Sequence, residues 1–262
     1  MPKVSVIMST FNDADYLPAA INSVLGQTFG DFELLITDDA STDATAEVLK
    51  KYQIRDNRIT SWRNNNQLGL TANLNVMLAK VQGEFIARLD SDDEWIDSNK
   101  LKQQVEFLQN HPACALVGAW AEVVTDDGKK LYNFQPPAQD QSIKNQILWR
   151  NCFVHSSILA RKQNITQAGG YDIKQTYIED YALWLKLGLA GELANLPQVM
   201  VRYRVNQKGV TQSKNLEQIK GALALIGAYK KRYPGFVKAK VKWLFQYLFT
   251  AVFGTQNLVR LK

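Results

Sequence analysis

Short apolar segments alternate with helical patterns through the first ninety residues, and each apolar segment is followed by polar or acidic side chains. The apolar segments cover residues 4–8, 32–36, 59–62 and 85–89, and the helical spacings cover residues 16–25, 45–52 and 70–81. This alternation predicts βαβ units around a parallel sheet. Because ligands of such sheets bind outside the carboxyl ends of the strands, we expect residues 9–13, 38–39 and 90–93 to meet in one crevice.

The second half of the chain is less regular. Strand-like stretches cover residues 115–124, 131–134, 157–160 and 199–203, and helical patterns cover residues 101–108 and 180–189. No segment with the composition of a linker occurs before about residue 206. We therefore predict one α/β catalytic domain over residues 1–215 and a basic, amphipathic helical extension over residues 216–262.

The positive charge of the chain is concentrated at its C-terminal end. The formal net charge is +6, yet residues 1–215 hold 22 basic and 24 acidic side chains, whereas residues 216–262 hold nine basic and one acidic. The body is therefore nearly neutral. Since the basic residues lie in no groove-reading motif, the charge does not indicate a partner nucleic acid.

The C-terminal extension carries a lysine-rich segment that leads into an apolar one. Lys238, Lys240 and Lys242 precede residues 243–253, which are apolar nearly all round. A helix of that length extends about 16 Å, roughly half the hydrocarbon thickness of a bilayer. We expect it to lie on an anionic leaflet, with docking on its own domain or on another subunit as the alternative. With no leader-like segment in the printed sequence, we expect a cytoplasmic protein, peripheral at the inner face of the cell membrane.

Three acidic clusters carry chemistry. Asp90 and Asp92 lie two residues apart after an apolar strand, so both can reach one divalent cation of the Mg²⁺ or Mn²⁺ type. Asp38 and Asp39 could accept hydrogen bonds from a base or a ribose. Glu179 and Asp180 begin a helix, where a carboxylate could take a proton from an acceptor hydroxyl. The alternative in each case is a capping or solvated turn.

The same clusters belong to an ordered series of motifs. The series comprises residues 4–12 (VSVIMSTFN), 36–43 (ITDDASTD), 89–95 (LDSDDEW), 169–172 (GGYD) and 179–184 (EDYALW). Over roughly residues 3–205 it resembles family 2 of the inverting glycosyltransferases. The resemblance implies a GT-A fold, in which a Rossmann-like nucleotide-binding half and an acceptor half share one continuous mixed sheet, followed here by C-terminal helices.

The resemblance also assigns roles to residues of this sequence. Asp180 matches the catalytic base and Asp92 the metal ligand, with Mn²⁺ or Mg²⁺ as cofactor. The nucleotide side takes Thr10, Phe11, Asn12, Asp38, Asp39, Asn66 and Asp90, with Asp38 nearer the base and Asp90 nearer the donor sugar. The acceptor or phosphate side takes Glu179, Trp184, His155, Arg161 and Arg204. Asn206 stands where many relatives have a histidine near the phosphates.

The implied reaction is the transfer of a sugar, with inversion, from a nucleotide-diphospho-sugar to a hydroxyl of a glycan or lipid-linked acceptor in cell-envelope polysaccharide synthesis. By resemblance we expect a UDP-sugar. The alternatives are a metal-dependent nucleotidyl- or phosphotransferase, which shares the nucleotide half and the carboxylate–metal site, and a non-catalytic module that binds sugar nucleotides or glycans.

Overall fold

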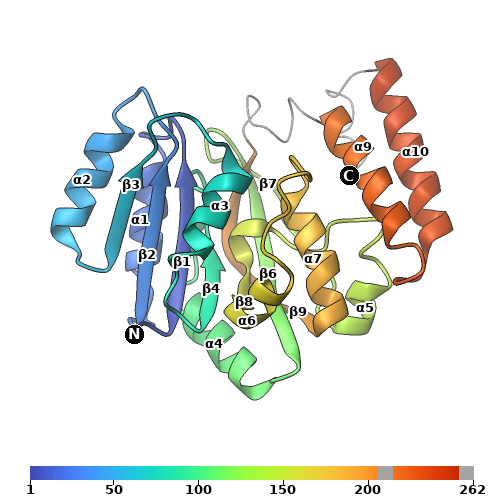
Figure 1. Cartoon of the computed structure of the whole chain (residues 1–262), viewed down its shortest axis with the longest axis horizontal. Helices are drawn as coiled ribbons and strands as arrows, with labels where there is room; N and C mark the ends of the chain where they lie inside the picture. Colours follow the sequence, from blue (N-terminus) through green and yellow to red (C-terminus); the bar gives the residue numbers. More distant parts are fainter. Residues whose placement is uncertain (206–214, 254–262) are drawn as a thin grey trace.

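The computed structural model describes residues 1–205 and 215–253 (Figure 1). The N-terminal half contains β1 (Val4–Thr10), α1 (Leu17–Leu25), β2 (Phe32–Asp38), α2 (Thr45–Arg55), β3 (Ile59–Arg63), α3 (Leu70–Leu78), β4 (Phe85–Arg88), β5 (Glu94–Trp95) and α4 (Lys100–Asn110). The second half contains β6 (Cys114–Thr125), β7 (Lys130–Phe134), α5 (Asp140–Lys144), the 3-10 helix His155–Ser157, β8 (Leu159–Arg161), α6 (Lys162–Gln167), α7 (Glu179–Ala190), β9 (Glu192–Val205), α9 (Asn215–Ala228) and α10 (Phe236–Phe253).

The strands form one mixed sheet in the order β3-β2-β1-β4-β8-β6-β9-β5, with β7 paired to β6. Strands β1 to β4 pair in parallel, whereas β8 runs antiparallel to both β4 and β6. After β1 the chain first builds outward through β2 and β3, and then returns to place β4 on the other side of β1. This reversal places the carboxyl ends of β1 and β4 next to each other at the point where the strand order reverses, and sheets of this kind bind ligands in the crevice outside such a point. The predicted α/β fold with one continuous mixed sheet is confirmed.

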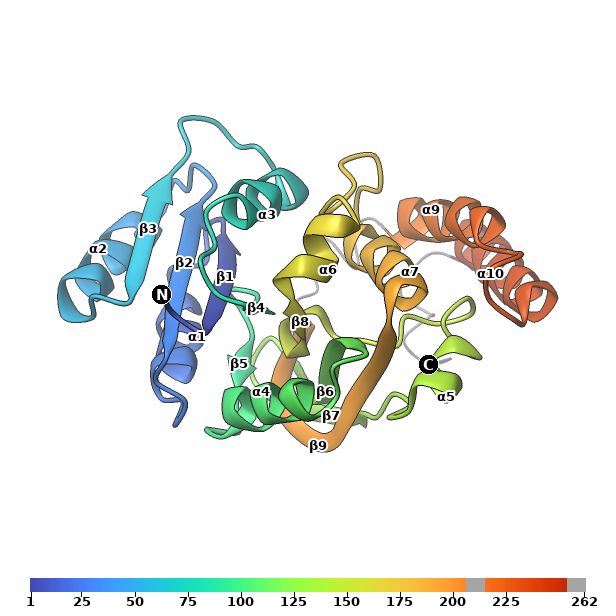
Figure 2. The same ribbon diagram turned by 60° about the horizontal axis from the view of Figure 1, so that its bottom comes forward.

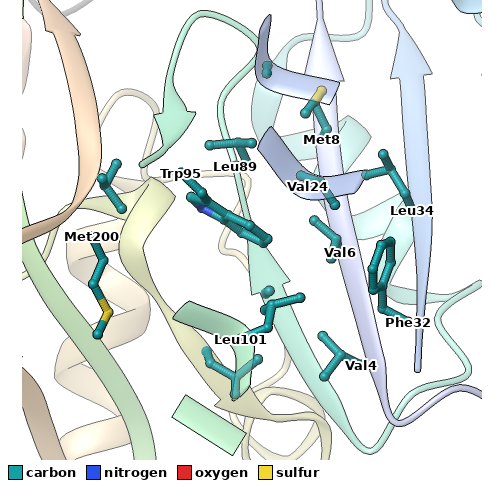
Figure 3. Packing of buried hydrophobic residues seen from close by; sticks show 14 of the residues in the cluster. Val4, Val6, Met8, Val24, Phe32, Leu34, Leu89, Trp95, Leu101 and Met200 are labelled. Carbon is teal, nitrogen blue, oxygen red and sulfur yellow. The ribbon is translucent and has the colours of Figure 1, made fainter. Parts of the chain in front are cut away.

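Side chains alternate between the two faces of the sheet, as the two-residue period of a strand requires. In β1, Val4, Val6 and Met8 enter one hydrophobic cluster, while Ile7 enters the cluster on the opposite face. The first cluster spans both halves of the molecule. In Figure 3 the indole of Trp95 lies between Met200 of β9 and Val6 of β1. A shared core of this kind holds the two halves in one rigid arrangement around the crevice.

The C-terminal helices α9 and α10 lie side by side, beyond α7 in Figure 1. Helix α10 begins directly after Gly235 and has 18 residues, so it is longer than the apolar segment 243–253 suggests. Ala239 is fully buried in the second cluster, and Trp243 packs against that cluster and donates from Nε1 to the carbonyl of Leu148 at 2.9 Å. One face of α10 therefore docks on the chain's own body, which is the alternative set out above.

The C-terminal region also contacts helix α7 directly. Tyr233, at the end of the α9 region, donates from its hydroxyl to the carbonyl of Leu185 at 2.7 Å. A methyl group at Gly188 would lie 2.5 Å from that hydroxyl, so only glycine leaves room for it. Among the described residues, no helix is both long and apolar enough to cross a membrane.

Candidate active site

The three predicted polar groups meet at the carboxyl ends of β1, β2 and β4. The hydroxyl of Ser91 donates to the carboxylate of Asp13 at 2.6 Å and to the carbonyl of Ser9 at 3.2 Å, which joins the segment after β4 to the end of β1. The amide of Asp39 donates to the carbonyl of Thr10 at 2.9 Å, which joins the end of β2 to the same place. Residues 9–13, 38–39 and 90–93 therefore lie together at one edge of the sheet, as the strand directions predict.

Asp38 offers an unused acceptor. Its Oδ1 accepts from the amide of Ser41 at 2.9 Å, while Oδ2 is buried and accepts no hydrogen bond from the described residues. The Nε atom of Arg63 lies 3.6 Å from Oδ2, as an ion pair without a hydrogen bond. A buried carboxylate oxygen without a donor is costly, so a ligand that donates an N–H here would be stabilised.

Asp39 differs from its neighbour, because its oxygens are already occupied. It accepts from the amides of Leu68 and Gly69 at 2.8 and 2.9 Å and from Nδ2 of Asn64 at 2.8 Å. Burial alone would raise the pKa of Asp39, but these donors outweigh burial and lower it. Asp39 therefore organises the loop before α3. The expectation that Asp39 contacts the base or ribose stays a prediction, and it now concerns a carboxylate that already accepts from three donors.

The other residues predicted for the nucleotide side have different exposures. Thr10 is buried at the end of β1, whereas the ring of Phe11 is 39% exposed at the crevice. Asn12 adopts a left-handed φ of 56°, and its side-chain oxygen accepts from the amide of Thr42 at 2.7 Å. Asn66 is exposed in the loop that Asp39 organises, and the neighbouring Asn64 makes the contact to Asp39.

Asp90 is bound on both sides. Arg88, fully buried in β4, donates from Nη2 to Asp90, and the hydroxyl oxygen of Ser156 lies 3.1 Å from its other oxygen. Burial alone would raise the pKa of Asp90, but the charge of Arg88 and the hydrogen bonds from Ser156 and Arg88 together outweigh burial and lower the pKa. Asp90 therefore stays charged at the centre of the crevice.

Asp92 is the carboxylate of this segment that remains available. Burial, followed by the charges of Asp90 and Asp13, raises the pKa of Asp92 to about 7. In the part of the chain that the structure describes, no side chain donates to it, and no cluster of three metal-ligating side chains occurs. Asp93, by contrast, accepts from the hydroxyl of Ser156 and from the amide of Arg204. One unpaired carboxylate among like charges fits a divalent cation whose other ligands come from a substrate.

Asp180 lies on the other side of the crevice, in the first turn of α7. Its Oδ2 accepts from Nδ2 of Asn151 at 2.9 Å, and its Oδ1 accepts from the amide of Tyr181 at 2.6 Å. Burial raises the pKa of Asp180, and the charge of Asp90 adds to that effect. Burial also raises the pKa of the adjacent Glu179 to about 7, followed by the charge of Asp180. A carboxylate with a raised pKa in a cleft is suited to general-base chemistry.

His155 lies beneath these carboxylates. Burial lowers its pKa to about 3, so the ring is neutral, and Nε2 lies 2.8 Å from the hydroxyl of Tyr171. The ring of His155 also meets Trp184 edge-on, with centroids 5.7 Å apart. Trp184 is fully buried, so it packs behind the site instead of lining it.

The two predicted arginines lie in very different places. Arg161 pairs with Phe85 at the start of β4, the end of the sheet opposite the crevice, and donates to the carbonyls of Cys114 and Leu108. Its assignment to the acceptor or phosphate side is wrong. Arg204 lies beside the acidic segment and donates from Nε to the carbonyl of Asp92 at 3.1 Å. Asn206 lies outside the described residues.

Several residues that complete the site are absent from the sequence-based assignment. They are Arg88, Asn151, Ser156, Asn64 and Tyr171. Arg88 carried a usable signal, since a charged residue inside an apolar strand must be paired when it is buried. The others are polar residues of loops or turns whose contacts depend on tertiary structure.

The family model "Glycosyl transferase family 2" matches residues 5–169. TuaG of Bacillus subtilis strain 168, assigned as a teichuronic acid biosynthesis glycosyltransferase, is 30% identical over 218 residues, which cover 81% of this chain and 83% of TuaG. The O-antigen biosynthesis glycosyltransferase WbnJ of Escherichia coli is 31% identical over 218 residues, covering 80% of this chain and 82% of WbnJ.

Solved structures share the fold. TarS 1–349 of S. aureus in complex with UDP-GlcNAc gives a TM-score of 0.70 at 19% identity, covering 99% of this chain and 76% of that one. The mannosyltransferase PcManGT of Pyrobaculum calidifontis, in complex with GDP-Man and Mn²⁺, gives a TM-score of 0.69 at 16% identity, covering 99% of this chain and 78% of that one.

Proposed function

The chain belongs to glycosyl transferase family 2, and on that premise we propose that it moves a sugar from a UDP-sugar, with inversion, to a hydroxyl of a glycan or lipid-linked acceptor in cell-envelope polysaccharide synthesis. One observation carries the proposal. Asp180, anchored by Asn151 on the acceptor side, lies within electrostatic reach of Asp90 on the nucleotide side. This proximity supports a base and a donor site that act on the same substrate pair.

The roles follow from the contacts. Asp38 Oδ2 lacks a donor and suits a nucleobase N–H, and the exposed ring of Phe11 lies at the same strand ends. Asp90, held charged by Arg88, suits the hydroxyls of the donor ribose or sugar. Asp180 takes the proton of the acceptor hydroxyl, which attacks the anomeric carbon opposite the leaving nucleoside diphosphate. A single displacement of this kind inverts the anomeric centre.

Asp92 would hold the divalent metal, Mn²⁺ or Mg²⁺, together with the donor diphosphate. The ion would stabilise the negative charge that develops on the leaving group. The carboxylate of Asp92 supports this assignment, because no side chain of the described residues donates to it and because burial and the charges of Asp90 and Asp13 raise its pKa. Hard oxygen ligands of this kind select these ions. The donors named for the two solved structures, UDP-GlcNAc and GDP-Man, support a nucleoside diphosphate sugar as the class of donor.

The test is a transfer assay with purified protein. A panel of UDP-, dTDP- and GDP-sugars with Mn²⁺ is first screened by thermal shift, and the donor that stabilises the protein most is then supplied with hydroxyl acceptors. We expect release of the nucleoside diphosphate and a product of inverted anomeric configuration by NMR. Release of a nucleoside monophosphate, or a product of retained configuration, contradicts the proposal.

The C-terminal helix extends the proposal to a membrane surface. Opposite its docked face, α10 presents Val237, Val241, Leu244, Phe245, Leu248 and Val252, each between 40% and 74% exposed. These six residues, the apolar face of α10, recur at helical spacing along about 23 Å of helix. Exposed basic residues at positions 230–232 and 240 lie close to them in the sequence. Apolar and basic side chains together fit the headgroup region of an anionic leaflet.

Two of the predicted lysines have another role. Lys242 donates from Nζ to the carbonyl of Trp149 at 2.7 Å, and the Nζ atoms of Lys238 and Lys242 lie 4.9 and 5.1 Å from the Trp149 ring centroid. They help to dock α10 on the body. A chain truncated near Tyr233 would therefore lose structure as well as any membrane contact, and surface substitutions make the cleaner test.

Vesicle co-sedimentation tests the apolar face. The full chain should pellet with phosphatidylcholine vesicles that contain phosphatidylglycerol, whereas the double variant Phe245→Ser, Leu248→Ser should stay in the supernatant. Ile54→Ser, at a 79% exposed position on α2, is the matched control and should pellet like the unmodified chain. Equal pelleting of the double variant contradicts membrane contact through this face. A dimer in light scattering without vesicles, dissociated by the double variant, assigns the face to a second copy instead.

A further inference from the structure

Helix α3 is connected to both sides of the candidate site. In Figures 1 and 2 it lies between the strands of the N-terminal half and the region of α6 and α7. Its N-terminus is fixed by Asp39, which accepts from the amides of Leu68 and Gly69 just before the helix. The side-chain Nδ2 of Asn64 also donates to Oδ1 of Asn73 within the helix at 2.7 Å. The nucleotide side therefore determines where α3 begins.

Further along α3, Asn75 makes two hydrogen bonds to the backbone of one residue. Its Nδ2 donates to the carbonyl of Tyr171 at 2.8 Å, and its Oδ1 accepts from the amide of Tyr171 at 3.0 Å. The neighbouring Gly170 has a left-handed φ of 69°, and a methyl group there would lie 2.8 Å from Oδ1 of Asn75. The turn at residues 169–171 is therefore shaped to receive this side chain.

Tyr171 continues the connection toward the base. It is buried, and its hydroxyl lies 2.8 Å from Nε2 of His155, whose ring meets Trp184 of α7. The chain runs from Tyr171 to Ile178, which is also buried in the second cluster, and then into Glu179 and Asp180. Movement of Tyr171 would therefore disturb both the support beneath the carboxylates and the segment that carries the base.

We propose that Asn75 is a positioning residue for Asp180: it couples the loop organised by Asp39, on the nucleotide side, to the segment at residues 169–180 that carries the base. The proposal rests on the proposed function for the identity of the base, but the coupling itself is a property of the fold. A displacement of the base by about 1 Å can cost on the order of 100-fold in rate, so such a connection matters for turnover.

Hydrogen exchange measures the coupling without any catalytic assay. In the unliganded protein, Asn75→Ala should speed amide exchange at residues 169–181 and leave the strands β1 and β2 unchanged. Val76→Ala, at an exposed position on the same helix, is the matched control and should exchange like the unmodified chain. Added UDP should protect residues 169–181 in the unmodified chain and not in Asn75→Ala.

Kinetics separate positioning from general stability. Asn75→Ala should lower kcat by about 100-fold, leave the donor Kd unchanged and alter the acidic limb of the pH–rate profile, because the base is no longer held in place. Asn75→Asp keeps the acceptor for the Tyr171 amide and loses the donor to its carbonyl, so its kcat should be intermediate. This second variant serves if Asn75→Ala does not fold.

The outcomes are distinct. Unchanged kcat in the Asn75 variants, or faster exchange spread evenly over the whole chain, overturns the proposal. If the unmodified chain shows no transferase activity, the proposed function fails. In that case, local faster exchange at residues 169–181 in Asn75→Ala still supports the coupling, and its absence still rejects it.

Discussion

The side chain of Asn151 donates from Nδ2 to Oδ2 of Asp180 across 2.9 Å. The other carboxylate oxygen accepts from the amide of Tyr181, so both oxygens of Asp180 are oriented by donors. These two hydrogen bonds favour the charged form, and burial opposes them and raises the pKa. The result is a carboxylate held in one orientation and still able to accept a proton.

Asp180→Asn should abolish transfer while donor binding survives. An amide has the size of the carboxylate but cannot act as a base, so kcat should fall by about 10²–10⁴-fold. Transfer is measured by chromatography of the released nucleoside diphosphate, and donor binding by calorimetry. Near-normal turnover in the variant would show that another group is the base.

Asp38 and Asp39 should respond to the same substitution in opposite ways. In Asp38→Asn, Oδ1 can still accept from Ser41, but an amide replaces the oxygen that lacks a donor, so donor Kd should rise at least about tenfold with little change in stability. In Asp39→Asn, one of three donors loses its acceptor, and the free energy of unfolding should fall by about 1–3 kcal/mol.

Calorimetry and urea denaturation of the two variants check this pair. Each variant is the control for the other, since the residues are adjacent and both are buried. A large loss of stability in Asp38→Asn, or a selective loss of donor binding in Asp39→Asn, would reverse the roles assigned above.

Chelation should remove activity. We expect no transfer in EDTA and full recovery with Mn²⁺ or Mg²⁺, because the unpaired carboxylate of Asp92 is the metal ligand proposed here. Asp92→Asn should respond weakly to added metal, whereas Asp31→Asn, at an exposed position before β2, should recover fully. Undiminished transfer in thoroughly chelated buffer would reject the metal.

Glu179→Gln should stabilise the fold at pH 8 and not at pH 4.5. Burial raises the folded-state pKa of Glu179 to about 7 from an ordinary value of 4.5, with a further contribution from Asp180. Between these values the folded protein holds a proton that the unfolded chain has released, so unfolding free energy declines as pH rises through this window. Glutamine does not titrate and so removes that decline, which should make the free energy of unfolding of the variant about 1–3 kcal/mol higher than that of the unmodified chain at pH 8.

Urea denaturation at pH 4.5, 6 and 8 measures the effect. Glu106→Gln, at an exposed position on α4, is the control for the substitution itself. A difference between Glu179→Gln and the unmodified chain that stays constant with pH would show that folding does not shift the pKa of Glu179.

The strands and helices of the nucleotide half follow from the sequence because each one carries a clear period. Residues 4–8, 32–36 and 85–89 are apolar runs of strand length, and the structure has β1, β2 and β4 there. The short strand β5 and the helices α5 and α6 were not predicted, since two to six residues are too few to show a period. The first half of β9 was missed as well, where Pro197 interrupts the strand pattern.

The residues of the site also fall into those that the sequence predicts and those that it does not. Strand-end carboxylates such as Asp38, Asp90 and Asp92 could be predicted, because strand direction alone brings them together. Whether a carboxylate is free or occupied could not, since Asp39 is saturated by Asn64 and by the loop at residues 64–69, whose path no pattern reveals. Arg161 is assigned to the acceptor or phosphate side by resemblance alone, and the antiparallel direction of β8, which its sequence does not reveal, places it at the other end of the sheet.

The hydroxyl of Tyr233 fits the space left by Gly188 on the helix that carries Glu179 and Asp180. The C-terminal helices, which we propose contact the membrane, therefore pack directly against the helix that carries the proposed base. A chimera that takes these helices from a relative must also keep a small residue at the position of Gly188 in α7. It must also keep the backbone carbonyl of Leu148 where Trp243 can donate to it. A substitution on the docked face of α10 can therefore change catalysis as well as the membrane contact proposed above.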